Sequence, residues 1–227
     1  MEVYACRLPD YRDESMLYRA FPLIPINRRE RLRRFRQLDD AFRSLVADLL
    51  IRFVYRKWTG SKLSFLEYKI NRYGKPFILG EKGFHFNTSH SGAWIVCAVY
   101  FKEVGIDIER VQILPQGLGN ELFTRKEKQI AENANSVNYF YDIWTAKESF
   151  VKAIGTGLFT PLQSMQIEMG KSGACAVIDM KTASPVEEVK IHHYNLDDGY
   201  KLAVCVLDKD CIFNYTVQKI DYKELVE

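Results

Sequence analysis

Apolar side chains recur every three or four positions along residues 27–58, which is the spacing of one face of an α-helix. The positions are Leu32, Phe35, Leu38, Phe42, Leu45, Leu49 and Phe53. Asn27 followed by Glu30 is typical of a helix N-terminus, because an amide can cap the first turn and an acid three residues later completes the cap. We therefore predict a helix over 27–58 that ends near Gly60 and bends around 37–39.

The remaining apolar segments are short and rich in β-branched and aromatic residues, which favours strands. Strands are predicted at 2–8, 84–88, 93–101 and 104–110, with five more between 163 and 222. Two further helices are predicted at 124–133 and 137–154, after a loop at 111–120.

Two parts of this pattern resemble each other. Residues 92–99 and 199–206 both run from a turn glycine into an apolar strand, and the helical segment 27–58 has a rough counterpart in 124–154. This echo predicts an α+β chain of two similar lobes, an internal pseudodimer, with one lobe at 1–110 and the other at 111–227. Such a chain can work as a monomer.

Composition is that of an ordinary globular protein, with 47% hydrophobic and 27% charged residues and a net charge of +3. The five cysteines lie far apart, and no CxxC pair indicates a zinc site or a disulfide framework. The N-terminus lacks the features of a signal peptide, and no apolar run reaches the ~18 residues of a membrane span. We expect a soluble, cytoplasmic protein without a membrane association.

The segment 105–109 (GIDIE) is the first candidate for chemistry. Alternation along a strand places Asp107 and Glu109 on one face and the isoleucines on the other. Paired carboxylates are the hard oxygen ligands that suit Mg²⁺. The alternative is an amphipathic edge strand whose charged face is only solvated.

The segment 144–152 (WTAKESFVK) is the second candidate. Glu148 and Lys152 are four residues apart and share one face of the predicted helix. Such a pair can be an ordinary surface ion pair. The aromatic and apolar neighbours instead indicate a packed helix, with Glu148 at the edge of a cleft.

Two further segments could bind phosphate. In 86–92 (FNTSHSG), Ser89 and His90 can donate hydrogen bonds to phosphate oxygens, although a polar turn would have the same composition. No G-x-S-x-G motif indicates a serine nucleophile. The arginine-rich stretch 28–36 implies either an anionic partner or a solvated helix face.

Taken in order, GKP (74–76), FNTSHSG, GIDIE and WTAKESFVKAIGTGL resemble the phosphopantetheinyl transferase superfamily. The pattern is closest to the long, two-lobed bacterial type that activates surfactin synthetase. The resemblance implies a holo-[carrier protein] synthase that moves the 4′-phosphopantetheine of coenzyme A onto a carrier-protein serine and releases 3′,5′-ADP. It also implies a part in nonribosomal peptide or polyketide synthesis, and hence in antibiotic biosynthesis.

The resemblance implies a role for each matching residue. The implied ligands of Mg²⁺ are Asp107, Glu109 and Glu148. The implied contacts of coenzyme A are Arg28, Arg31, Ser44, Lys75, Pro76, Ser89, His90, Asp107 and Lys152. Glu148 and Lys152 are the implied catalytic pair, since the serine needs a base and the diphosphate needs a cation. Glu127 is a second candidate for the base.

The resemblance also implies that a peptidyl or acyl carrier protein docks near 111–128, where Leu118, Leu122 and Phe123 are followed by Arg125 and Lys126. The alternative is that Leu122 and Phe123 belong to the local core. Two other functions are open to the same residues. One is an RNA-binding module, which the acids of GIDIE and WTAKE disfavour, so no nucleic-acid partner is expected. The other is a metal-dependent phosphoesterase, in which water replaces the serine.

Overall fold

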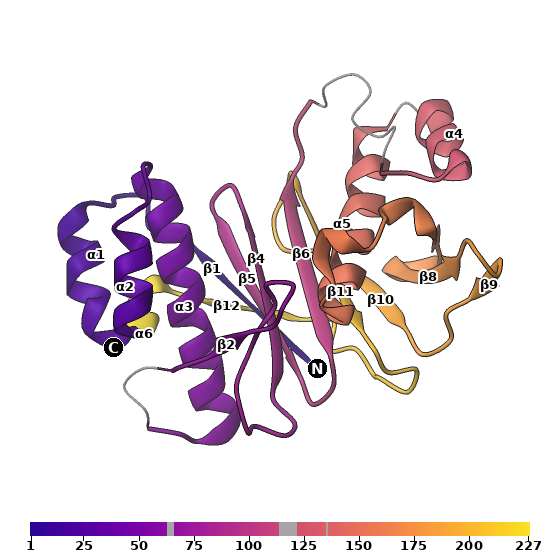
Figure 1. Cartoon of the computed structure of the whole chain (residues 1–227). Helices are drawn as coiled ribbons and strands as arrows, with labels where there is room; N and C mark the ends of the chain where they lie inside the picture. The colour runs from indigo at the N-terminus through magenta and orange to yellow at the C-terminus, as the bar shows by residue number, and fades with distance from the viewer. Residues whose placement is uncertain (63–65, 114–121, 135) are drawn as a thin grey trace.

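The computed structural model describes residues 1–62, 66–113, 122–134 and 136–227. Two sheets lie in the middle of the molecule, with helices α1, α2, α3 and α6 on one side and α4 and α5 on the other (Figure 1). The arrangement is therefore helix, sheet, sheet, helix. The predicted α+β class and the two-lobed plan are confirmed.

The first sheet has the strand order β12-β1-β5-β4. Its strands are β1 (Glu2–Arg7), β4 (His85–Ser91), β5 (Trp94–Tyr100) and β12 (Val217–Ile220). Its helices are α1 (Glu14–Ala20), α2 (Ile26–Leu32), α3 (Leu38–Thr59) and the C-terminal α6 (Tyr222–Val226). Because β12 pairs in parallel with β1, the end of the chain completes the sheet that its beginning starts.

The second sheet has the order β6-β11-β10-β8-β7, and β9 pairs with β8. Its strands are β6 (Val104–Arg110), β7 (Met165–Met169), β8 (Ala174–Asp179), β9 (Ser184–Pro185), β10 (Lys190–Tyr194) and β11 (Tyr200–Val206). Helix α5 (Val137–Ile154) packs on this sheet, and α4 (Arg125–Ala134) packs on α5. A separate small hairpin is formed by β2 (Lys69–Ile70) and β3 (Pro76–Phe77).

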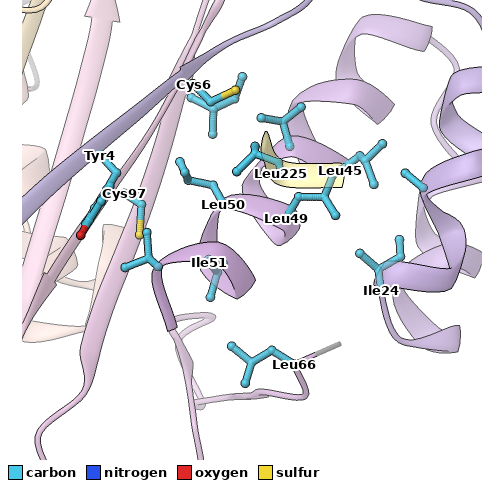
Figure 2. Close-up of a cluster of buried hydrophobic side chains, with 14 of the residues drawn as sticks. Tyr4, Cys6, Ile24, Leu45, Leu49, Leu50, Ile51, Leu66, Cys97 and Leu225 are labelled. Atoms are coloured by element: carbon cyan, nitrogen blue, oxygen red, sulfur yellow. The ribbon is translucent and has the colours of Figure 1, made fainter. Parts of the chain in front are cut away.

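Three apolar clusters hold these layers together. In the first, the face of the first sheet that carries Tyr4 and Cys97 packs against α3 and α6 (Figure 2). Strand residues of both sheets, among them Val96 and Val204, form the second cluster between the sheets. The third lies between α5 and the outer face of the second sheet. Successive residues of one strand therefore point into different apolar clusters.

The two sheets also meet edge to edge, at β4 and β6. Here side chains make the links: Asn87 Oδ1 accepts from the Ile106 amide at 3.0 Å, and Ser91 Oγ accepts from the Arg110 amide at 3.0 Å. Hydroxyl and amide side chains of β4 therefore face the acidic strand β6 along this seam.

The structure corrects several predicted boundaries. The single helix over 27–58 is two helices, α2 and α3, separated at Arg33–Gln37, where Gln37 is extended and Asp39 forms an ion pair with Arg12 at 2.6 Å. The strand predicted at 84–88 continues to Ser91, so the serine and histidine of FNTSHSG lie on a strand. Helices α1 and α6 were not predicted.

The division of the chain at residue 110 stays a prediction. Strand β6 pairs with β11 of the second sheet, and β12 pairs with β1 of the first. Each sheet therefore contains one strand from beyond the predicted boundary.

Candidate active site

A cleft of about 670 Å³ opens between α2 and α3 on one side and α5 on the other, with β4 and β6 at its floor. Of the predicted site residues, Lys75 and the second candidate base Glu127 are not among its lining residues. The others line it: Arg28, Arg31, Ser44, Pro76, Ser89, His90, Asp107, Glu109, Glu148 and Lys152. Their sequence separation is large, so tertiary packing of the two lobes brings them together.

Asp107 lies at the centre of the cleft. Its Oδ1 accepts from Lys152 Nζ at 2.6 Å and from Ser89 Oγ at 2.9 Å, and Lys152 Nζ also lies 3.1 Å from Ser89 Oγ. Its Oδ2 is buried and has no hydrogen-bond partner in the described part of the chain. A buried carboxylate oxygen without a partner is costly, which marks this atom as a point of attachment for a ligand.

Glu109 and Glu148 both feel the negative charge of Asp107 and the positive charge of Lys152. Ser91 Oγ donates to Glu109 Oε2 at 2.8 Å and Trp144 Nε1 to Oε1 at 3.3 Å. Desolvation, then the charge of Asp107, raises the pKa of Glu109. Desolvation also raises the pKa of Glu148, and Asp107 and Glu109 add to the rise against the opposing charge of Lys152. The three carboxylates therefore repel one another across the cleft.

Gly105 is what lets the acidic strand and the helix come this close. A Cβ atom there would lie 2.1 Å from the Ser149 carbonyl oxygen and 2.3 Å from the Ala153 amide nitrogen. The glycine of GIDIE thus permits direct contact between β6 and the stretch of α5 that carries Glu148 and Lys152. This contact explains why the two motifs lie side by side in the cleft.

The donor chemistry of the cleft suits a hard divalent cation, with three carboxylates and one unpartnered buried oxygen. As the described side chains stand, no group of three His, Cys, Asp or Glu residues is close enough to hold a metal ion. The ammonium of Lys152 contacts Asp107 instead. The magnesium site stays a prediction.

The far end of the cleft is basic. Arg28 makes a two-point ion pair with Asp48, at 3.0 Å through Nε and 2.8 Å through Nη2, and its guanidinium lies 5.2 Å from the Tyr68 ring centroid. The Tyr68 hydroxyl donates to the same carboxylate. Arg31 is exposed on the cleft wall. Sequence reasoning missed Asp48 and Tyr68, because no local pattern connects either to Arg28.

His90 also faces this basic end. Desolvation lowers the pKa of its imidazole, and the positive charges of Arg43 and Lys152 lower it further. The imidazole is therefore mainly neutral at pH 7 and can donate one hydrogen bond.

Two predicted residues lie outside the cleft. The Lys75 ammonium is 2.5 Å from Glu103 Oε2 and 2.8 Å from the Ala153 carbonyl oxygen. Glu127, the second candidate for the base, is 1% exposed and pairs with Lys147 at 2.7 Å. The structure gives both side chains structural partners.

Part of the predicted docking segment 111–128, residues 114–121, lies outside the described residues. Next to it, Phe123 is buried in the core of the second lobe, while Arg125 and Lys126 are exposed. Carrier-protein docking here stays a prediction. Within the described ranges, no helix combines the length and the apolar character that crossing a membrane requires.

Comparison with known proteins gives consistent matches. A sequence profile of the 4′-phosphopantetheinyl transferase superfamily matches residues 103–205, and one of a 4′-phosphopantetheinyl transferase N-terminal region matches 12–102. A 4′-phosphopantetheinyl transferase of Bacillus subtilis is 35% identical over 92% of both chains. The transferase Sfp of Bacillus subtilis strain 168 is 32% identical over the full length of both.

Among solved structures, the holo-[acyl-carrier-protein] synthase of Thermotoga maritima aligns with a TM-score of 0.40 and 21% identity. The alignment covers 47% of this chain and 63% of that one.

Proposed function

Because this chain belongs to the 4′-phosphopantetheinyl transferase superfamily and transfers phosphopantetheine from coenzyme A to a carrier-protein serine, we propose that the cleft is its active site. One observation supports this most: Asp107 and Glu109 of β6 face Glu148 and Lys152 of α5 in a cleft whose other end is basic. We further propose that the enzyme works as a cytoplasmic monomer in nonribosomal peptide or polyketide synthesis.

Coenzyme A would lie along the cleft. Arg28, Arg31 and Ser44 would receive the 3′-phosphate, with His90 as a neutral donor beside it. Pro76 would contact the adenine, while the Lys75 side chain supports the wall behind it. Lys152 and Ser89 would contact the diphosphate. This order runs from the basic end of the cleft to its acidic centre.

Asp107, Glu109 and Glu148 would hold Mg²⁺. When bound, the ion would supply positive charge beside the diphosphate and offset the repulsion among the three carboxylates. The buried Oδ2 of Asp107 supports this assignment, because a cation is the partner that this atom lacks in the described chain.

The reaction forms a bond between the serine Oγ of the carrier protein and the phosphorus next to pantetheine, and breaks the bond from that phosphorus to the oxygen of 3′,5′-ADP. Glu148 would accept the hydroxyl proton. The ammonium of Lys152 would stabilise the negative charge that develops on the diphosphate oxygens. Its flexible stem allows it to leave Asp107 for the diphosphate.

Mass spectrometry of an apo carrier protein, incubated with the enzyme, Mg²⁺ and coenzyme A, tests the proposal. We expect the carrier to gain the mass of phosphopantetheine while 3′,5′-ADP is released in equal amount. Release of 3′,5′-ADP with an unmodified carrier would instead identify a phosphoesterase. Omission of Mg²⁺ should prevent both the mass gain and the release.

A further inference from the structure

The turn between β2 and β3 is fastened to the C-terminal end of α5. Asn71 Nδ2 donates to the Gly155 carbonyl oxygen at 3.0 Å, and Lys75 Nζ donates to the Ala153 carbonyl oxygen at 2.8 Å. These are carbonyls at a helix end, which lack partners inside the helix. The positive charge of Lys75 also suits the negative end of the helix dipole.

Asn71 has a second role within the turn itself. Its Oδ1 accepts from the amides of Tyr73 and Lys75, at 2.9 Å each. One side chain therefore shapes the turn with its oxygen and attaches the turn to α5 with its nitrogen.

The helix end is built for this close contact. Gly155 has a left-handed φ of +75°, and a Cβ there would lie 3.0 Å from Lys75 Cδ and 3.2 Å from Asn71 Nδ2. Glu103, just before β6, closes the contact by accepting from Lys75 Nζ. Desolvation lowers the pKa of Lys75, against the opposing effect of Glu103, as expected for an ammonium enclosed by protein.

This attachment links two walls of the cleft. Gly74 and Pro76, on the turn side, line the cleft together with Lys152, which directly precedes Ala153 on α5. The contacts of Asn71 and Lys75 join these two walls directly, next to the residues that line the cleft. The β2–β3 ladder only joins the two arms of the turn. Besides Asn71 and Lys75, the turn contacts the segment after α5 through the rings of Tyr73 and Phe159, whose centroids are 5.2 Å apart, and β3 contacts β4.

We propose that Asn71 and Lys75 are positioning residues that hold the nucleotide-binding turn in register with Lys152. The proposal rests on the cleft being the coenzyme A site. Neither side chain contacts the reacting atoms. Both act by keeping the wall at Gly74 and Pro76 at a fixed distance from the cation that meets the diphosphate.

The test is Asn71→Asp, which keeps the oxygen that shapes the turn and replaces the donor to Gly155 by a second, repelling oxygen. We expect the dissociation constants of coenzyme A and of 3′,5′-ADP, measured by calorimetry, to rise together by about tenfold. The KM for coenzyme A should rise by a similar factor, with kcat changed by less than about twofold.

Asn214→Asp is the matched control, because Asn214 is exposed and its Oδ1 likewise accepts from an amide two residues on, that of Thr216. It should leave both affinities unchanged. If Asn71→Asp does not fold, Lys75→Met provides the same test, since it removes the donor to Ala153 and keeps the aliphatic stem.

The outcomes separate the two proposals. Wild-type protein that does not bind coenzyme A would overturn the assignment of the cleft and this inference with it. Wild-type protein that binds normally, together with variants that melt earlier but keep wild-type affinities, would leave the cleft in place and show that the attachment is merely structural.

Discussion

Helix α5 carries two lysine–carboxylate pairs of almost equal length, one in the interior and one in the cleft. Lys147 Nζ lies 2.7 Å from Glu127, and Lys152 Nζ lies 2.6 Å from Asp107. The side chains of the first pair are 0% and 1% exposed, whereas that of Lys152 is 27% exposed. Similar charge and distance therefore occur in two very different surroundings.

In the interior pair, both charged groups have further hydrogen-bond partners. Lys147 also donates to the carbonyls of Leu122, Leu162 and Met165, and Glu127 also accepts from the amides of Thr124 and Ile167. Each charge is thus fully used in joining α5 to the segments before and after it. In the cleft pair, by contrast, Oδ2 of Asp107 has no hydrogen-bond partner among the described residues. Unused hydrogen-bonding capacity, rather than ion-pair geometry, distinguishes the pair that we propose to be functional.

Asp107→Ala is expected to have the largest effect, a loss of turnover of at least about 10⁴-fold in the carrier-protein assay, because the variant removes the central charge of an interdependent site. The melting temperature should change little, because the two remaining partners stay satisfied: Lys152 can reach water, and Ser89 still accepts from Lys152. Asp198→Ala, at an exposed position, is the control. Near-normal turnover by Asp107→Ala would remove the cleft pair from the mechanism.

Lys147→Met should chiefly lower stability, whereas Asp107→Ala should chiefly lower turnover. It leaves Glu127 buried and unpaired, so we expect the free energy of unfolding, measured in urea, to fall by about 3–5 kcal/mol. Lys126→Met breaks the exposed pair with Glu168 and should cost about 0–1 kcal/mol. An equally small loss for both variants would mean that the interior pair does not stabilise the fold.

Gly105→Ala probes the contact that brings the cleft pair together. Its Cβ would meet the α5 backbone at 2.1 and 2.3 Å, so either the helix or the strand must move. We expect a loss of about 2 kcal/mol in unfolding free energy and a fall in kcat from the displacement of Lys152 and Glu148. Gly199→Ala is a control for glycine removal, because no atom lies within 4 Å of its Cβ position, although its positive φ adds some strain of its own. Wild-type kcat in Gly105→Ala would mean that this contact does not position the pair.

The sequence was sufficient for features that depend on local spacing. Alternation on a strand put Asp107 and Glu109 on one face, and a step of four put Glu148 and Lys152 on another, so only their convergence required the fold. The resemblance of the motifs to a known family predicted that the two pairs converge.

Long-range contacts were not predictable in this way. The break before α3 coincides with the ion pair between Asp39 and Arg12, which lies far away in sequence. Lys75 and Lys147 have long side chains whose partners, at the end of α5 and in the interior respectively, are set by tertiary packing. The sequence gives no sign of either set of partners: the resemblance implied a coenzyme A contact for Lys75, and Lys147 looks like a solvated charge.

Arg31→Ala compares the two arginines at the basic end. Arg28 is held by Asp48, whereas the exposed Arg31 side chain makes no hydrogen bond or ion pair among the described residues, so its removal should leave the fold intact. We expect the KM for coenzyme A to rise about tenfold, and that for dephospho-coenzyme A to rise much less, because only the former carries the 3′-phosphate. Equal increases would argue against the contact. Arg28→Ala should in addition lower the free energy of unfolding, because it leaves the buried Asp48 carboxylate without its ion-pair partner.

The smallest effect concerns His90, whose pKa responds to desolvation in the cleft and to the nearby positive charges. Its pKa is lowered below the ordinary value of about 6.5, by desolvation and then by Arg43 and Lys152. As the pH falls below about 6.5, the unfolded chain therefore takes up this proton before the folded one, and stability decreases down to the folded pKa. The imidazole is partly desolvated, but the residue as a whole keeps an exposed surface, so solvent screening should keep the change well below about 1 kcal/mol.

An NMR titration measures this directly, with His90→Asn identifying the resonance. We expect a midpoint below 6.5 in the free protein and an upward shift when 3′,5′-ADP is bound, because the phosphate charge favours the imidazolium. A midpoint at or above 6.5 in the free protein would contradict a positive cleft. A midpoint that 3′,5′-ADP does not move would place the phosphate elsewhere.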